Sequence, residues 1–123
     1  MNNILAVFIG GGLGSLARYG IAKFILTYFK FIFPVATLMS NILSCTLLAC
    51  TVVLLNAKAD LSPAWKWLII TGFCGGFSTF SAFSHETVEL IRNGHLWYAI
   101  TNIFINIIFC IGIVFVIVKN QSI

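Results

Sequence analysis

Long stretches without charge divide this chain into four segments. Residues 31–57 and 93–118 contain no charged side chain, and neither do residues 1–17 and 67–85. A helix rises about 1.5 Å per residue, so about 20 apolar residues cross a hydrocarbon core of about 30 Å. The pattern therefore predicts an all-α integral membrane protein with four transmembrane helices, at approximately 3–28, 33–56, 66–91 and 95–118.

The composition supports this prediction and excludes other classes of protein. Of the 123 residues 60% are hydrophobic and only 8% are charged, whereas soluble domains average about 25% charged residues. Soluble enzymes and basic nucleic-acid-binding proteins are therefore excluded, and the chain is expected to form a single membrane domain over residues 1–123. The apolar segments are continuous and do not alternate with a period of two, so a transmembrane β-barrel is disfavoured.

The basic residues are shared almost equally between the two sides of the predicted bundle. Basic residues normally collect on the cytoplasmic side and set the orientation. Here one side would carry three basic residues, Lys58, Lys66 and Lys119. The other side would carry Lys23, Lys30 and Arg92, and also Arg18 if it reaches that side. This balance predicts insertion in both orientations and an antiparallel homodimer; one orientation set by other factors is the alternative. Anionic lipid headgroups are sufficient partners for these cations.

The third predicted helix contains an unusual stretch, GFCGGFSTFSAFSHE, over residues 72–86. By helical rise, Gly75 and Gly76 lie about 14 Å from Lys66, near the middle of the membrane. Unwound backbone at that depth is tolerated only inside protein or along a cavity, and broken helices at the midplane build ion sites. The stretch predicts a helix break whose free carbonyl groups bind a monovalent cation. A tight glycine-mediated crossing without a break is the alternative.

Several side chains are candidates for contact with an anion, each with a structural alternative. Phenylalanines recur every three or four residues in the third helix, which is usual for packing, but ring edges carry partial positive charge. Asn41 lies on a polar stripe with Thr37 and Ser44, and can either join helices or donate its N–H groups to an anion. Asn102 and Asn106 share one face of the fourth helix and carry the same two interpretations.

Arg18 and the four cysteines are further candidates for a functional role. Arg18 lies deep in the first span, where it either extends to the interface or lines an electropositive vestibule. The four cysteines all lie in apolar segments and are interpreted as small packing residues; they are Cys45, Cys50, Cys74 and Cys110. The chain has no catalytic triad, zinc-ligand spacing or phosphate-binding loop. An enzyme is not expected.

Three motifs together resemble the Fluc (CrcB) family of fluoride channels. They are Gly11-Gly12-x-Gly14-Ser15-x-x-Arg18-Tyr19, Thr37-Leu38-x-x-Asn41 and GFCGGFSTFSAFS. The resemblance spans nearly the whole chain. It implies an antiparallel, dual-topology homodimer in the inner membrane of a bacterium, with two pores that passively export cytoplasmic fluoride and so limit its toxicity. A small multidrug transporter and a non-transporting assembly subunit are the alternatives; the first needs an acidic residue in its first helix, and here there is none.

The resemblance also implies roles for individual residues. The rings of Phe80 and Phe83 would face fluoride edge-on, Asn41 would donate to it, and hydroxyl groups would add donors; these belong to Thr37, Ser81 and Thr79. Arg18 would lie at the vestibule, and Glu86 matches a carboxylate that follows the signature. A structural sodium ion at the dimer axis would be held by the backbone carbonyls of Gly75 and Ser78 from each subunit.

This chain departs from the family pattern at several positions. Ala36 and Ser44 replace glycines, and Ser78 replaces a common threonine, which would not affect a backbone carbonyl ligand. Asn102 and Asn106 occupy the region where the family has a tyrosine and a serine. The contribution of the fourth helix to a pore is therefore left open.

Overall fold

The computed structural model describes residues 1–57 and 60–121, and this part of the chain is helical without strands. Three spans are single helices, α1 (Asn3–Tyr28), α2 (Val35–Ala57) and α6 (Leu96–Val118). The third consists of α3 (Pro63–Lys66), η1 (Trp67–Cys74), α4 (Gly75–Phe77) and α5 (Phe80–Arg92). All four are long and apolar enough to cross a membrane, which confirms the four predicted spans. Lys58, used in the charge comparison, lies outside the described residues.

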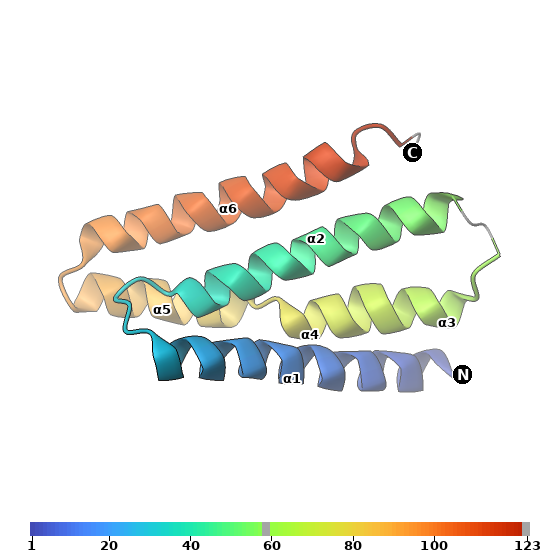
Figure 1. The fold of residues 1–123 in the computed structure, drawn as a ribbon, viewed down its shortest axis with the longest axis horizontal. Coiled ribbons are helices and arrows are strands. Elements are labelled where there is room, and N and C mark those ends of the chain that lie inside the picture. Colours follow the sequence, from blue (N-terminus) through green and yellow to red (C-terminus); the bar gives the residue numbers. More distant parts are fainter. Residues whose placement is uncertain (58–59, 122–123) are drawn as a thin grey trace.

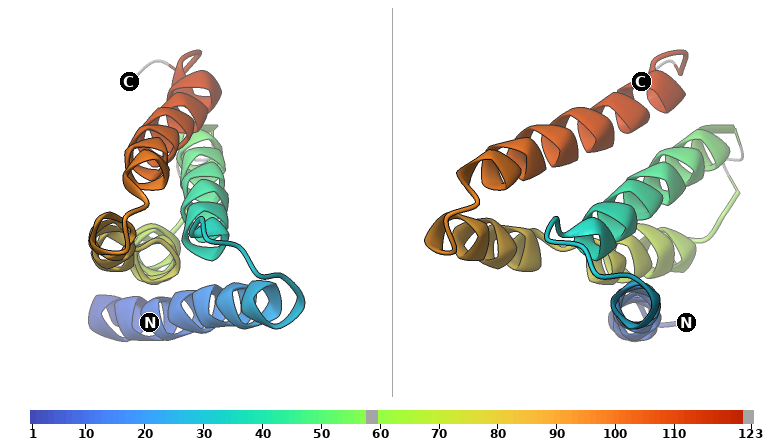
Figure 2. Two further views of the ribbon diagram at one scale, coloured as in Figure 1. Left: turned by 90° about the vertical axis from the view of Figure 1, so that its left-hand side faces the viewer. Right: turned by 60° about the vertical axis from the view of Figure 1, so that its left-hand side comes forward.

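The four spans run back and forth, so that the start of α1 and the end of α6 lie at the same end of the bundle (Figure 1). Helix α1 packs against η1 and α4, whereas α6 packs mainly against α2. Among the described residues α1 and α6 do not meet, because α2 and the third span separate them (Figure 2). The third span therefore lies against α1 on one side and against α2 and α6 on the other.

Local signals in the sequence set several helix ends. The side chain of Asn2 accepts a hydrogen bond of 3.0 Å from the N–H of Ile4 and so caps α1. Pro63 begins the third span, at a position where its missing N–H has no helical partner to lose. Gly94 adopts a positive φ of 81° and turns the chain between α5 and α6.

Glycines allow α1 to approach the third span closely. A Cβ atom added at Gly14 would overlap the carbonyl oxygen of Phe73 and lie 2.9 Å from the amide nitrogen of Phe77. Gly10 faces the Leu68 carbonyl in the same way, one helical turn earlier. In lipid, packing replaces the hydrophobic effect as the source of helix association, so this backbone contact holds the first and third spans together.

The third span is interrupted at Ser78 and Thr79, which confirms the predicted break within residues 72–86. Both residues are extended, with φ/ψ of −78°/157° and −151°/121°. Gly75 and Gly76 just before the break are helical. Gly76 serves packing, because an added Cβ would lie 2.5 Å from the Gly11 carbonyl oxygen.

The glycine contact predicts a clear difference between two substitutions. Gly14→Ala forces α1 away from Phe73 and is expected to lower the free energy of unfolding by about 1–3 kcal/mol, as overpacked substitutions do. Gly12→Ala is the matched control, since no heavy atom lies within 4 Å of its added Cβ. Thermal unfolding of both variants in detergent micelles measures the effect, and equal stability would contradict this packing.

Candidate functional site

The side chain of Asn41 holds the break in the third span. Its Oδ1 accepts the backbone N–H of Thr79 at 2.8 Å, and its Nδ2 donates to the carbonyl oxygen of Thr79 at 3.4 Å. The hydroxyl of Thr79 accepts the N–H of Ala82 at 3.1 Å and so caps α5. These bonds replace hydrogen bonds that the backbone N–H and carbonyl groups lose at the break. Backbone polar groups inside a membrane require such partners.

A directional chain of hydrogen bonds fixes Asn41 in turn. Its Nδ2 also donates to Oδ1 of Asn106 at 3.1 Å, and Nδ2 of Asn106 donates to Oδ1 of Asn102 at 2.8 Å. Nδ2 of Asn102 then donates to the hydroxyl of Thr87 at 3.0 Å, and this hydroxyl donates to the carbonyl oxygen of Phe83 at 2.7 Å. The chain runs from α2 through α6 to α5 and ties the break to the Phe83 turn.

The break leaves several carbonyl groups without their helical partners, among them those of Gly75 and Ser78. The N–H of Thr79 donates to Asn41 and therefore does not bond to the carbonyl oxygen of Gly75, its partner in a continuous helix. The N–H of Ala82 donates to the Thr79 hydroxyl and therefore does not bond to the carbonyl oxygen of Ser78. The resemblance to the family implies the carbonyls of Gly75 and Ser78 as sodium ligands, which stays a prediction.

Neighbouring carbonyls, by contrast, are satisfied by side chains. The Cys74 carbonyl accepts the hydroxyls of Ser44 at 2.9 Å and Ser78 at 2.8 Å. The Gly76 carbonyl accepts Nε of Arg18 at 3.2 Å. Serine at position 44 therefore provides a hydrogen bond across α2 and the third span that a glycine there would lack.

Phe80 and Phe83 lie together beside the break. Their ring centroids are 5.5 Å apart and their planes are tilted by 46°. Both line a hollow of about 260 Å³, which we call the midplane hollow, together with Asn41, Cys45, Ser78, Thr79, Asn106, Ile107, Cys110 and Ile111. Phe83 is only 8% exposed, whereas Phe80 is 79% exposed and projects from the chain. One chain therefore builds only part of the surroundings of these rings.

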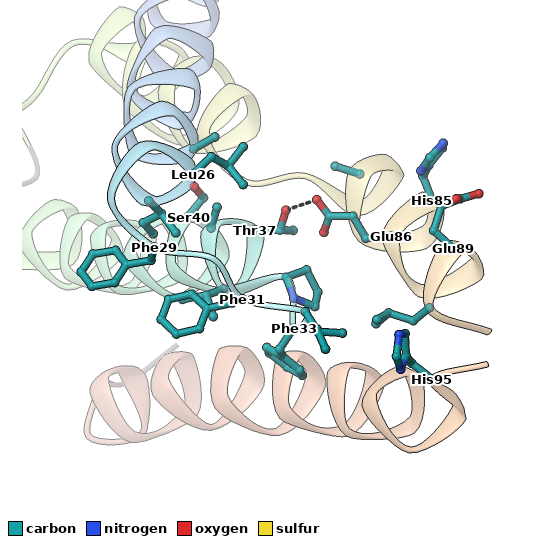
Figure 3. A pocket seen from close by; sticks show the side chains of 18 of the residues that line it. Leu26, Phe29, Phe31, Phe33, Thr37, Ser40, His85, Glu86, Glu89 and His95 are labelled. Atoms are coloured by element: carbon teal, nitrogen blue, oxygen red, sulfur yellow. Dashed lines mark hydrogen bonds between the residues drawn. The ribbon is translucent and has the colours of Figure 1, made fainter. Parts of the chain in front are cut away.

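A larger cavity of about 590 Å³, which we call the end cavity, lies near the end of α1 and the start of α2. Arg18, Thr37, Ser40 and Glu86 line it with several aromatic side chains, and the Thr37 hydroxyl donates to Oε1 of Glu86 at 2.7 Å (Figure 3). Oε2 of Glu86 and the hydroxyl of Ser40 have no partner among the described residues. The end cavity thus presents both a cation and carboxylate oxygens.

The predicted site residues fall into two groups in space. Asn41, Phe80, Phe83 and Thr79 meet at the midplane hollow, and the Thr79 hydroxyl lies 3.3 Å from that of Ser81. Arg18, Thr37 and Glu86 line the end cavity instead. Asn102 lines neither the end cavity nor the midplane hollow, and it accepts a hydrogen bond from Asn106, which lines the hollow. Their contacts with ions stay predictions.

Two polar residues of these surroundings, Thr87 and Ser40, were not among the predicted site residues. Thr87 lies four residues after Phe83 in α5, on the same face, and this spacing is the signal that the sequence offers. Ser40 belonged to the polar stripe of α2, but only the fold places its hydroxyl in the end cavity, where it is 1% exposed.

Comparison with known proteins gives consistent matches over most of the chain. Residues 5–118 match the family model described as CrcB-like protein, Camphor Resistance (CrcB). The fluoride-specific ion channel FluC of Pyrococcus horikoshii is 46% identical over 112 residues, which cover 91% of this chain and 89% of that protein. FluC 1 of Yersinia pseudotuberculosis is 43% identical over 106 residues, 86% of this chain and 83% of the relative.

A third relative, the FluC channel of an Escherichia coli strain, is 40% identical over 105 residues, which cover 85% of this chain and 82% of the relative. The matched region includes all four spans and the interruption in the third. The chain therefore belongs to the CrcB family.

Proposed function

We propose that this chain is a fluoride channel of a cell membrane, with the midplane break as the centre of its ion path. Its relatives carry the name fluoride-specific ion channel, and four apolar spans make it a multi-pass membrane protein. The observation that carries the proposal is the start of α5 in the middle of the third span, beside Asn41 and the two phenylalanine rings.

The electrostatics of the break favour an anion on one side and a cation on the other. The first N–H groups of α5 have no helical partners, so this helix end carries partial positive charge in the middle of the span. The preceding helical segment ends in free carbonyls and carries partial negative charge. One interruption thus provides backbone donors for a halide and backbone acceptors for a cation, while the Arg18 guanidinium bonds to the neighbouring Gly76 carbonyl.

The end cavity and the midplane hollow suggest a route for fluoride. Ser40 of α2 and Ala82 of α5 line the end cavity. The residues that directly follow them, Asn41 and Phe83, line the midplane hollow, so the two spaces are neighbours. Fluoride is small and strongly hydrated, so a path must supply hydrogen-bond donors in place of water. Amide groups, hydroxyls and ring edges supply them without holding the ion as tightly as a lysine would.

A second copy of the chain would complete this path. Phe80 is exposed in the single chain beside the polar groups of Thr79 and Ser81. Polar groups at this depth are costly in contact with lipid, and a protein surface that covers them removes this cost. The balanced distribution of basic residues supports an antiparallel partner, so that two oppositely oriented copies form two equivalent paths that export fluoride across the inner membrane.

The two free carbonyls fit a structural sodium ion. Gly75 and Ser78 would each contribute a neutral oxygen ligand, and the same pair from a second copy would raise the number to four. When bound, sodium supplies positive charge between two anion paths, where a buried ion dominates the local field. Helix ends with free carbonyls coordinate sodium in other membrane proteins.

Fluoride efflux from liposomes tests the proposed function. The protein is expected to dissipate a fluoride gradient and not a chloride gradient, as followed with ion-selective electrodes. Phe80→Ile removes a ring edge, and Asn41→Asp replaces donors with a negative charge; each is expected to lower fluoride efflux at least tenfold, or about 1.4 kcal/mol in barrier height.

Phe24→Ile is the matched control, because Phe24 is exposed on α1 and lines neither the end cavity nor the midplane hollow. Its efflux is expected to match that of the natural protein. Efflux that is insensitive to both Phe80→Ile and Asn41→Asp would remove these residues from the ion path, and equal passage of chloride would refute fluoride selectivity.

The chain of amides predicts an effect of Asn106 on flux and stability. Asn106→Leu leaves Nδ2 of Asn41 with only its 3.4 Å bond to the Thr79 carbonyl. We expect the free energy of unfolding to fall by about 1–3 kcal/mol, together with a loss of fluoride efflux. Thr101→Val, on an exposed part of α6, serves as control and should leave both unchanged; an Asn106→Leu protein with normal efflux would contradict this role.

Removal of sodium tests the cation proposal. Replacement of sodium by N-methylglucamine is expected to dissociate the dimer and abolish efflux, as measured by sedimentation in detergent and by liposome assay, since a ligand of the assembled state stabilises it. Ser78→Ala should keep the sodium requirement, because the proposed ligand is the carbonyl and not the hydroxyl. A dimer that is indifferent to sodium would refute this site.

A further inference from the structure

Two of the four cysteines lie together in the wall of the midplane hollow. Cys45 on α2 and Cys110 on α6 both line it, beside Phe80 and Phe83. Helices α2 and α6 pack against each other, so the two thiols face one hollow from neighbouring helices. Both are free and half-buried. The proposed fluoride path assigns no role to either sulfur atom.

We propose that Cys45 and Cys110 form a two-thiol binding site for a soft divalent cation of linear coordination, of which the mercuric ion is the type, and that its binding blocks the fluoride path. Soft cations prefer sulfur ligands. Within residues 1–57 and 60–121 no group of three or more histidine, cysteine or acidic side chains could hold a metal. The site therefore does not suit zinc, which takes four ligands.

The reaction at this site balances without an oxidant. Two S–H bonds break and two S–metal bonds form, so that one divalent cation displaces two protons, which leave to water. A single thiolate is costly in apolar surroundings, but two thiolates around one divalent cation form a neutral unit. The neutral product explains why an apolar wall between α2 and α6 accommodates this ion, although it contains no charged side chain.

Binding would affect fluoride passage because of where the two sulfur atoms lie. The hollow that they share with Asn41 and Phe83 measures only about 260 Å³. A metal bridge would also fix α2 to α6, the two helices that carry the amide chain. This blocking effect rests on the proposed function, whereas metal binding by the two thiols does not.

The binding experiment uses the full chain in detergent and the mercuric ion itself. Glutathione, a monothiol, competes for the bound metal, and native mass spectrometry measures the metal that remains. The Cys50→Ala/Cys74→Ala chain, which keeps the site, is expected to bind one mercuric ion and to require at least tenfold more glutathione for its removal than Cys45→Ala or Cys110→Ala in that background. Zinc should not be retained.

Equal retention in the single-thiol variants, or in Cys45→Ala/Cys110→Ala with the other cysteines kept, would overturn the proposal. If the Cys50→Ala/Cys74→Ala background does not fold, Cys45→Ser and Cys110→Ser in the otherwise natural chain provide the same comparison. Each expected difference depends on two sulfur ligands acting together, so a merely accessible thiol would not produce it.

Flux measurements test the blocking effect separately. Mercuric chloride, which is neutral and crosses bilayers, is expected to lower fluoride efflux at least tenfold in chains with both thiols and much less in Cys45→Ala/Cys110→Ala. Dithiothreitol should restore efflux. Normal efflux with mercury retained would overturn the blocking effect but not the binding site, and absence of efflux before mercury is added would count against the proposed function instead.

Discussion

The hydrogen bonds between Asn41 and the backbone of Thr79 are the interaction on which the rest of this structure depends. An interrupted helix in the middle of a membrane exposes N–H and carbonyl groups that lipid cannot satisfy. One amide side chain supplies both a donor and an acceptor to the same residue. The interruption can therefore persist at a depth where an unbroken helix would otherwise be favoured.

The same interruption gives opposite partial charges to two neighbouring helix ends. The free carbonyls of Gly75 and Ser78 lie on one side of it, and the start of α5 lies on the other. Because these charges belong to backbone dipoles, the proposed path would hold an ion weakly enough for its release. The amides of α6 hold this arrangement in place, which gives Asn102 and Asn106 a structural reason to be polar.

The glycine contacts of α1 place the third span so that its polar face meets α2 and α6. A chain of this size has few fully buried side chains, and close backbone packing at Gly10 and Gly14 compensates for the small interior. The exposed ring of Phe80, beside polar groups at the same depth, marks the surface that a second copy would cover. In the proposed dimer, sharing the path between two chains would compensate for the small interior of one chain.

The sequence by itself determined the number of spans, their approximate ends and the existence of an interruption in the third, because charge-free length and unusual polarity are properties of a linear pattern. It did not determine where the interruption falls. Gly75 and Gly76 are both helical, and Gly76 packs closely against Gly11 of α1. The helix ends at Ser78 because Asn41 from another span satisfies the backbone of Thr79. Likewise, only the tertiary structure separated Thr37 and Glu86, in the end cavity, from Asn41 and Phe80, in the midplane hollow. Such assignments depend on contacts between helices, which no single helix encodes.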